Sequence, residues 1–148
     1  MRNPSSSART NVAAPEIASR LRLSATRLAR RLRQESGAGL SPSQQSALAV
    51  IFNHGPLTLG ALAEHERVAP PSITKVVSKL ESDGLVIRTP DSVDRRVCRV
   101  AISPEGASLL EESRRRKTLW LTARITDLDP ERQRRLADAL DVLDELTS

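Results

Sequence analysis

The stretch SITKVVSKLESDGLV at residues 72–86 decides how this chain folds. Its apolar residues recur at steps of three and four, the period of one helix face: Ile73, Val76, Val77 and Leu80. This spacing predicts a helix that begins at Pro70-Pro71, where proline fits the first turn, and runs to Asp83, with Gly84 as its C-cap. The other side of the same helix carries short polar groups and lysines: Ser72, Thr74, Lys75, Ser78 and Lys79.

The segments around this helix predict a β-hairpin after it and two helices before it. Residues 85–102 contain two strand-like segments joined by PDSVD, which is typical of a turn. A short helix is predicted at Leu59–Glu66, and a longer one follows the capping sequence Ser41-Pro42-Ser43-Gln44. The order helix, short helix, helix and hairpin is that of a winged helix-turn-helix, which we place at residues 41–103. The predicted fold class is mainly α with a small β-hairpin wing.

Long helices are predicted on both sides of this unit. The first has an apolar stripe at helical steps: Ile17, Leu21, Ala25, Leu28 and Leu32. A second begins after Ser103-Pro104 and reaches about residue 127, and the last follows Asp129-Pro130. The last helix has a stripe of leucines: Leu136, Leu140, Leu143 and Leu146. Residues 1–14 lack such a period and are predicted to form a flexible basic arm, so residues 15–148 make a single domain.

The composition favours a helical protein and is compatible with binding to nucleic acid. The 148 residues include one Phe, one Trp and no Tyr, so the core must consist of aliphatic side chains. The net charge is +5 and the pI is about 10.6, a value typical of nucleic-acid binders. Most basic residues are Arg, whose planar fork donates paired hydrogen bonds to phosphates and bases. Genomic base composition would explain an excess of Arg and Ala equally well.

The sequence lacks the motifs that indicate an enzyme, a metal site or a cofactor. It has no P-loop, no Gly-rich dinucleotide turn, no HExxH motif and only 2 His, so we expect neither catalysis nor a cofactor. We interpret the one cysteine, Cys98, as a structural or incidental thiol, with a redox role as the alternative. No apolar run approaches the roughly 20 residues of a membrane span, and residues 1–15 lack the apolar core of a signal peptide. We therefore expect the protein to be located in the cytoplasm.

The polar face of the helix after Pro70 and the tip of the hairpin both predict contacts with duplex DNA. Short polar groups and lysines suit the donors and acceptors that base edges display in the major groove. The tip sequence Asp94-Arg95-Arg96 places a carboxylate beside two arginines. An arginine there can enter a narrow minor groove, and the carboxylate can hold it in one rotamer. The alternatives are an ordinary amphipathic helix with a solvated face and a surface turn with a local ion pair.

Residues 72–106 resemble the MarR family of bacterial winged helix-turn-helix transcription regulators. The resemblance rests on four segments: Ser72–Glu81 (SITKVVSKLE), Asp83–Val86 (DGLV), Asp91–Arg96 (DSVDRR) and Val100–Gly106 (VAISPEG). It implies that Arg96 reaches the minor groove, that Asp94 orients it, and that Arg95 contacts the DNA backbone. It also implies that the helix after Pro70 contacts the major groove through Ser72, Thr74, Lys75, Ser78 and Lys79. Pro70-Pro71 departs from the family because prolines lack the N–H groups that would meet a phosphate, so Ser72 and Lys75 would take over.

The resemblance further implies a homodimer, with residues 15–36 and 104–147 as the dimerisation helices. The last helix is acidic at Asp138, Asp141, Asp144 and Glu145, and the first is rich in Arg. Our hypothesis is that these faces attract each other within the dimer. Such a dimer would place two recognition helices in successive major grooves and prefer a pseudo-palindromic operator. Repression is the default outcome, because an occupied operator blocks polymerase.

Many members of this family release DNA when a small aromatic or anionic effector binds between the dimerisation helices and the winged domain. A pocket there would draw on Leu23, His54 or Trp120. Two rival interpretations remain: a winged-helix adaptor that binds proteins without specific DNA binding, and a basic RNA-binding protein. An adaptor would not need lysines and arginines gathered on one face, and an RNA binder would carry more aromatic residues for stacking.

Overall fold

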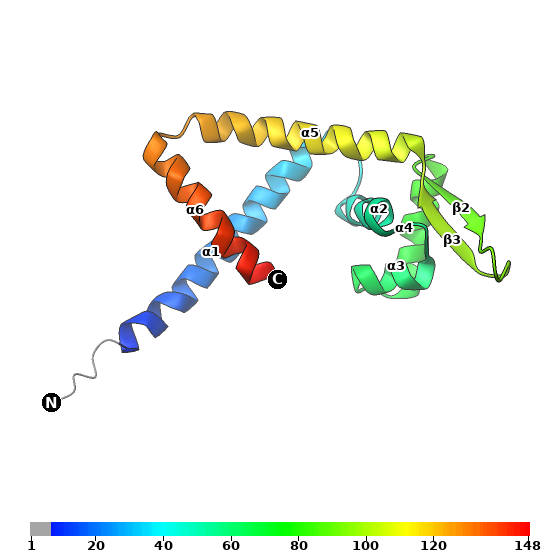
Figure 1. Cartoon of the computed structure of the whole chain (residues 1–148), viewed down its shortest axis with the longest axis horizontal. Coiled ribbons are helices and arrows are strands. Elements are labelled where there is room, and N and C mark those ends of the chain that lie inside the picture. Colours follow the sequence, from blue (N-terminus) through cyan, green and yellow to red (C-terminus); the bar gives the residue numbers. More distant parts are fainter. Residues whose placement is uncertain (1–6) are drawn as a thin grey trace.

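The computed structural model describes residues 7–148, with side chains from residue 13 onward. Its elements follow one another in this order: α1 (Ser7–Glu35), α2 (Pro42–His54), β1 (Leu57–Thr58), α3 (Leu59–Glu66), α4 (Pro70–Ser82), β2 (Val86–Pro90), β3 (Cys98–Ile102), α5 (Pro104–Thr126) and α6 (Pro130–Thr147). Helix α5 runs along one long edge of the molecule, with α1 and α6 at one end and the elements α2 to β3 at the other (Figure 1). We call residues 41–103 the winged unit. The winged helix-turn-helix fold is therefore confirmed.

The first helix begins earlier than the sequence analysis predicted. Helix α1 starts at Ser7 and contains Pro15, so the predicted helix start after Pro15 is wrong. A proline inside a helix removes one backbone hydrogen bond, so the sequence alone favours a helix that begins after Pro15. The predicted basic arm is helical from Ser7 onward, and its residues 1–6 lie outside the described part of the chain.

The core consists of aliphatic side chains of the winged unit together with Leu110 of α5. The largest fully buried side chains come from four elements: Leu48 and Ile51 of α2, Leu62 of α3, Ile73, Val77 and Leu80 of α4, and Val100 of β3. Three of the four apolar positions predicted for α4 are buried, and Val76 is half-buried at the edge of the same cluster. Ser41 and Gln44 cap α2 reciprocally, as its capping sequence predicts. These contacts fix α4 against α2 and α3.

The wing belongs to a three-stranded antiparallel sheet in the order β1-β3-β2. Val86 faces Ile102 and Arg88 faces Val100 in the hairpin, and Leu57 pairs with Val100 from the other side. The hairpin was predicted, whereas β1 was not, because a strand of 2 residues is too short to show an alternating pattern. The sheet joins the hairpin to the loop between α2 and α3.

A tight junction connects the end of α4 to the start of α5. Ser103 donates from its hydroxyl to the Gly84 carbonyl at 2.6 Å and accepts from the Gly106 N–H at 3.0 Å. The Ser103 N–H also donates to the Leu85 carbonyl at 3.0 Å. Gly106 packs so closely on the Leu85 carbonyl that a Cβ would collide with it. These contacts join the start of α5 to the residues that directly follow α4.

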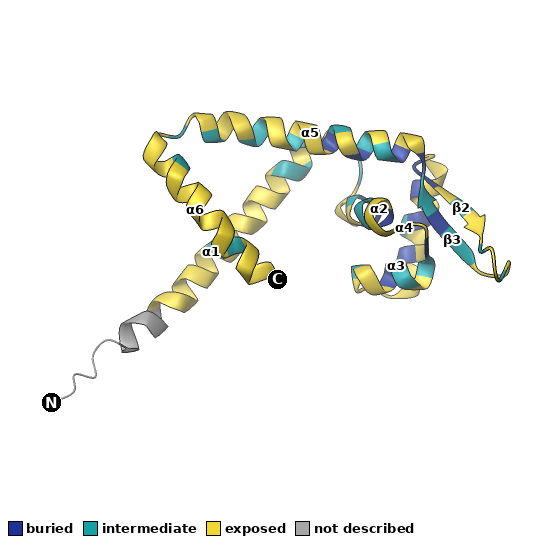
Figure 2. Ribbon diagram, in the orientation of Figure 1, coloured by how far each residue is buried: buried dark blue, intermediate teal, exposed yellow. Residues whose placement is uncertain are grey.

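The outer helices are mostly exposed, from residue 13 onward in α1 and throughout most of α6 (Figure 2). The exposed fraction is 63% for Ile17 on α1 and 66% for Leu146 on α6. No residue of α6 for which burial is described is buried. Of the residues in the predicted stripes, Leu21, Leu32 and Leu143 are half-buried and the others are exposed. None of the helices among the described residues is long and apolar enough to cross a membrane.

Candidate nucleic-acid interface

Helix α4 exposes all five polar residues that the sequence analysis assigned to DNA. Ile73, Val77 and Leu80 are buried, which turns the opposite face of the helix to solvent. That face carries Ser72, Thr74, Lys75, Ser78 and Lys79, each classed as exposed. Pro70 and Pro71 occupy the first turn, and Ala69 before them supplies no side-chain cap. The geometry therefore presents polar and cationic groups along one face, as a helix in the major groove requires.

Two of these five side chains have partners within α4 or at its C-cap. The Thr74 hydroxyl donates to the Pro70 carbonyl at 3.0 Å, an interaction within the first turn. Lys79 Nζ lies 2.9 Å from Asp83 Oδ1, one turn further along the helix. Both pairs are exposed, so each is a weak interaction that a phosphate or base edge can replace.

Arg88 on β2 is a residue that sequence reasoning missed. Its Nη2 donates to the Ser78 hydroxyl at 3.1 Å, and its Nε lies 2.9 Å from Glu81 Oε2. Arg88 therefore connects the wing to α4 and brings a third cation to the face that carries Ser78 and Lys75. The alternation in LVIRT placed Arg88 on a strand, but only the tertiary structure shows which helix residues it meets.

The wing turn is organised by Asp91. Its Oδ2 accepts hydrogen bonds from the N–H groups of Val93 at 3.2 Å and Asp94 at 3.1 Å. Its Oδ1 accepts from Arg99 Nε on β3. The Arg99 side chain and the two backbone N–H groups lower the pKa of Asp91 from 3.8 to about 2. An ionised Asp91 therefore fixes both the start of the turn and its width.

The tip of the wing holds an arginine in an extended, solvent-facing position. Arg96 Nε donates to Asp94 Oδ1 at 3.1 Å, and Arg96 Nη2 donates to Oδ2 at 3.2 Å. The Arg96 side chain is nevertheless 91% exposed, because the carboxylate contacts only the edge of its guanidinium group that Nε and Nη2 form. These hydrogen bonds hold the pKa of Asp94 below its ordinary value. The predicted pairing of Asp94 with Arg96 is present, and Arg95 lies exposed between them.

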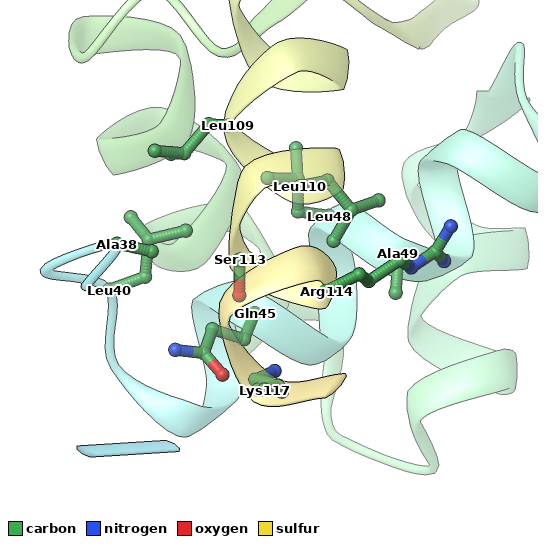
Figure 3. Close-up of a pocket in the computed structure, with 10 residues that line it drawn as sticks. All are labelled: Ala38, Leu40, Gln45, Leu48, Ala49, Leu109, Leu110, Ser113, Arg114 and Lys117. Atoms are coloured by element: carbon green, nitrogen blue, oxygen red, sulfur yellow. The ribbon is translucent and has the colours of Figure 1, made fainter. Parts of the chain in front are cut away.

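A cavity of about 120 Å³ lies between α2, α5 and the loop before α2 (Figure 3). Its apolar side includes Leu40, Leu48, Leu109 and Leu110, and its polar side is formed by Gln45, Ser113, Arg114 and Lys117. Burial, together with the charges of Arg114 and Arg33, lowers the pKa of Lys117. Leu23, His54 and Trp120, which the sequence analysis named for an effector pocket, do not line this cavity.

Two of those three side chains have other partners. His54 stacks on His65 with ring centroids 4.7 Å apart. The guanidinium groups of Arg31 and Arg124 both lie over the Trp120 ring, 5.6 Å and 5.2 Å from its centroid. Spacing along the chain could not reveal the cavity lining, because it combines residues of the loop before α2, of α2 and of α5.

Known proteins match this chain over most of its length. A protein of Mycobacterium leprae, named an uncharacterized HTH-type transcriptional regulator, is 42% identical over 131 residues, which are 88% of this chain and 92% of that protein. A solved structure of a transcriptional regulator protein from Pseudomonas aeruginosa has a TM-score of 0.82 at 31% identity, covering 92% of this chain and 96% of that one.

Two further comparisons identify the family. A solved MarR family protein from Bacillus stearothermophilus has a TM-score of 0.77 at 26% identity, covering 93% of this chain and 98% of that one. The sequence model of the MarR family matches residues 40–98, which span α2 to the start of β3. The helix order, the winged unit and these similarities lead to one conclusion: the chain belongs to the MarR family.

Proposed function

We propose that this protein is a transcription regulator that binds a pseudo-palindromic DNA operator as a homodimer and represses the genes beside it. The observation that carries this proposal is the wing tip, where Asp94 holds an almost fully exposed Arg96 in a defined position. The second support is α4, whose polar face lies open while its apolar face is fixed in the core. A rigid helix and a preset arginine on one small unit suit simultaneous contact with two grooves.

In this proposal the two parts of the winged unit perform different tasks. The exposed face of α4 contacts base edges and phosphates in the major groove through Ser72, Thr74, Lys75, Ser78 and Lys79. Arg96 enters the adjacent minor groove, and Arg95 contacts the backbone. Because Asp94 restricts the rotamers of Arg96 before binding, less side-chain entropy is lost when the complex forms.

The homodimer is supported by the exposed stripes of the outer helices. Large apolar side chains on these helices are exposed in a single chain: Ile17 and Leu28 on α1, Leu119 on α5, and Leu136, Leu140 and Leu146 on α6. A helix with an apolar stripe needs a partner surface, and an isologous dimer supplies one for both chains. Two symmetric winged units would then meet two half-sites, which is why we propose a pseudo-palindrome.

The cavity between α2 and α5 supports release by a small anionic effector. At about 120 Å³ it is smaller than the ~300–1,000 Å³ typical of sites for drug-sized ligands, so it suits a single-ring molecule. Arg114 and Lys117 supply positive charge beside an apolar wall. Because the cavity lies between the long helix α5 and the winged unit, an occupant would change the separation of the two recognition helices.

Titration with salicylate, a phenolic carboxylate, tests this effector site. We expect Lys117→Met to weaken binding several-fold, because the variant removes a cation that lines the cavity. Lys79→Met, on the exposed face of α4, is the matched control and should bind salicylate like the parent chain. Equal binding by all three proteins, or no binding by the parent, would rule out this anion site.

Selection of binding sites from a random duplex library tests the main proposal. We expect one palindromic sequence to be enriched, and Arg96→Ala to weaken binding to it about tenfold or more. Arg135→Ala removes the same charge from exposed helix α6 and should leave that affinity nearly unchanged. The contrary outcome is weak binding that does not depend on DNA sequence and is equal in both variants. Only non-specific electrostatic attraction would then remain, and a protein-binding adaptor would be the better interpretation.

A further inference from the structure

The apex of the wing carries an apolar side chain that buries nothing. Val93 is 93% exposed, the highest value among the exposed large apolar side chains of the described residues. It lies in the turn between β2 and β3, where glycine and small polar residues are common and β-branched residues are rare. Single exposed apolar residues occur on many surfaces, so the inference depends on what surrounds this one.

The turn holds Val93 in one place. The Val93 N–H donates to Asp91 Oδ2 at 3.2 Å, and the following Asp94 N–H donates to the same oxygen at 3.1 Å. Arg99 binds the other oxygen of this carboxylate from β3. At the far side of the turn, the Val97 N–H donates to the Asp94 carbonyl at 2.9 Å. Because the backbone is fixed on both sides of Val93, its isopropyl group projects from a preformed apex.

Cations lie beside this apolar group. Arg96 is 91% exposed and is held by Asp94, and Arg95 is exposed next to it. A tip that combines an apolar group with arginines matches a narrow groove whose walls are sugars and phosphates. The minor groove of A·T-rich DNA has this character, since it is narrow and strongly negative.

We propose that Val93 is a specificity-determining residue that enters the minor groove beside Arg96 and favours A·T over G·C base pairs there. This inference rests on the proposed DNA binding. A G·C pair places the guanine N2 amino group in the minor groove, whereas an A·T pair displays only acceptors. Valine cannot accept a hydrogen bond from that amino group, so its approach leaves the donor without water. Apolar side chains of other proteins occupy the minor groove in a comparable way.

The test uses the duplex selected from the random library, with the base pairs that flank its half-sites changed. One version has A·T flanks, one has G·C flanks, and one has inosine·C flanks. Inosine lacks the N2 amino group, so inosine·C resembles A·T in the minor groove and G·C in the major groove. We expect the parent chain to bind the A·T and inosine·C versions alike and the G·C version about fivefold more weakly.

Two variants separate Val93 from its neighbours. Val93→Thr keeps the shape of the side chain and adds a hydroxyl that accepts from guanine N2, so the difference between flanks should shrink to less than about twofold. Val68→Thr makes the same change at an exposed valine between α3 and α4 and should retain the parent ratio. The two variants differ only in where the hydroxyl is added, so a changed affinity ratio in Val93→Thr alone is due to its position at the wing tip.

The outcomes distinguish this inference from the function on which it rests. If Val93→Thr keeps the parent ratio while Arg96→Ala still weakens binding, Val93 does not determine specificity and the regulator proposal stands. Weaker binding of inosine·C, equal to that of G·C, would also overturn the inference, because the amino group would then not be what is sensed. If no sequence is enriched from the library, the proposed function fails and the inference fails with it.

Discussion

Arg88 of β2 donates a hydrogen bond to the hydroxyl of Ser78 on α4, with a distance of 3.1 Å from Nη2 to Oγ. The same guanidinium places its Nε 2.9 Å from Glu81 Oε2, and the side chain is only 27% exposed. One residue of the wing thus contacts two residues of the candidate recognition helix. The two parts that we propose to enter different grooves are held in a fixed relative orientation.

Replacing Arg88 by Met removes these contacts and keeps most of the aliphatic stem. The free energy of unfolding should change by less than about 1 kcal/mol, because the ion pair is partly exposed. Affinity for the selected duplex should fall several-fold, since the wing and α4 lose their common orientation. Urea unfolding and a binding titration measure the two quantities. An unchanged affinity would show that the Arg88 contacts do not position the wing.

Asp94→Asn distinguishes the effect of Arg96 orientation on DNA affinity from the effect of net charge. The variant makes the net charge more positive, so non-specific electrostatics alone would strengthen binding to DNA. We expect the opposite for the selected duplex, a several-fold loss, because an amide holds the guanidinium less firmly than a carboxylate does. Binding to a scrambled duplex at the same salt is the control. Tighter binding to both duplexes would contradict an orienting role for Asp94.

The sequence predicted the winged unit well, and it did so through local patterns. Helical spacing identified α4, and the turn sequence PDSVD between two strand-like segments identified the wing. Arg88 was missed because its partners lie on another element, and no local pattern reports such contacts. The start of α1 was misplaced because Pro15 is normally a helix boundary. The cavity between α2 and α5 was not identified because its lining combines distant segments.

The Asp91 carboxyl in the wing turn should become protonated at a lower pH than an ordinary Asp carboxyl does. The pKa of Asp91 is about 2, below its ordinary value of 3.8, because Arg99 and two backbone N–H groups bind the charged form. Its stabilisation of the fold is therefore present above pH 3.8 and is lost as the pH falls through about 2. The amide chemical shifts of Val93 and Asp94 report this titration. A midpoint near 3.8 would mean that Arg99 does not hold Asp91.

Gly106 and Gly60 give a matched pair of substitutions for the junction between α4 and α5. A Cβ at Gly106 would collide with the Leu85 carbonyl, so Gly106→Ala should lower the free energy of unfolding by about 1–3 kcal/mol. At Gly60 the nearest atom is Thr58 Oγ1 at 4.0 Å, and Gly60→Ala should be neutral or stabilising by up to about 1 kcal/mol. Urea unfolding compares the two. Equal stability of both variants would disprove the close junction.

Charge reversal on α6 tests the attraction that we propose between the subunits. Asp141 and Asp144 are exposed within one chain, and α1 carries many arginines. Asp141→Lys combined with Asp144→Lys should raise the dimer dissociation constant about tenfold at low salt and less at high salt, where charges are screened. Glu64→Lys on α3 is the control for added positive charge. Sedimentation of the double variant as a dimer with parent affinity would exclude this attraction.

A hydroxyl-radical footprint of the parent chain on the selected duplex tests most directly whether both parts of the winged unit bind DNA. Hydroxyl radicals report protection of the sugars that line the minor groove. We predict two symmetric protected stretches that flank the half-sites, and we predict that Arg96→Ala loses this flanking protection. A footprint without two-fold symmetry, or one that Arg96→Ala leaves unchanged, would contradict binding by a dimer through its wings.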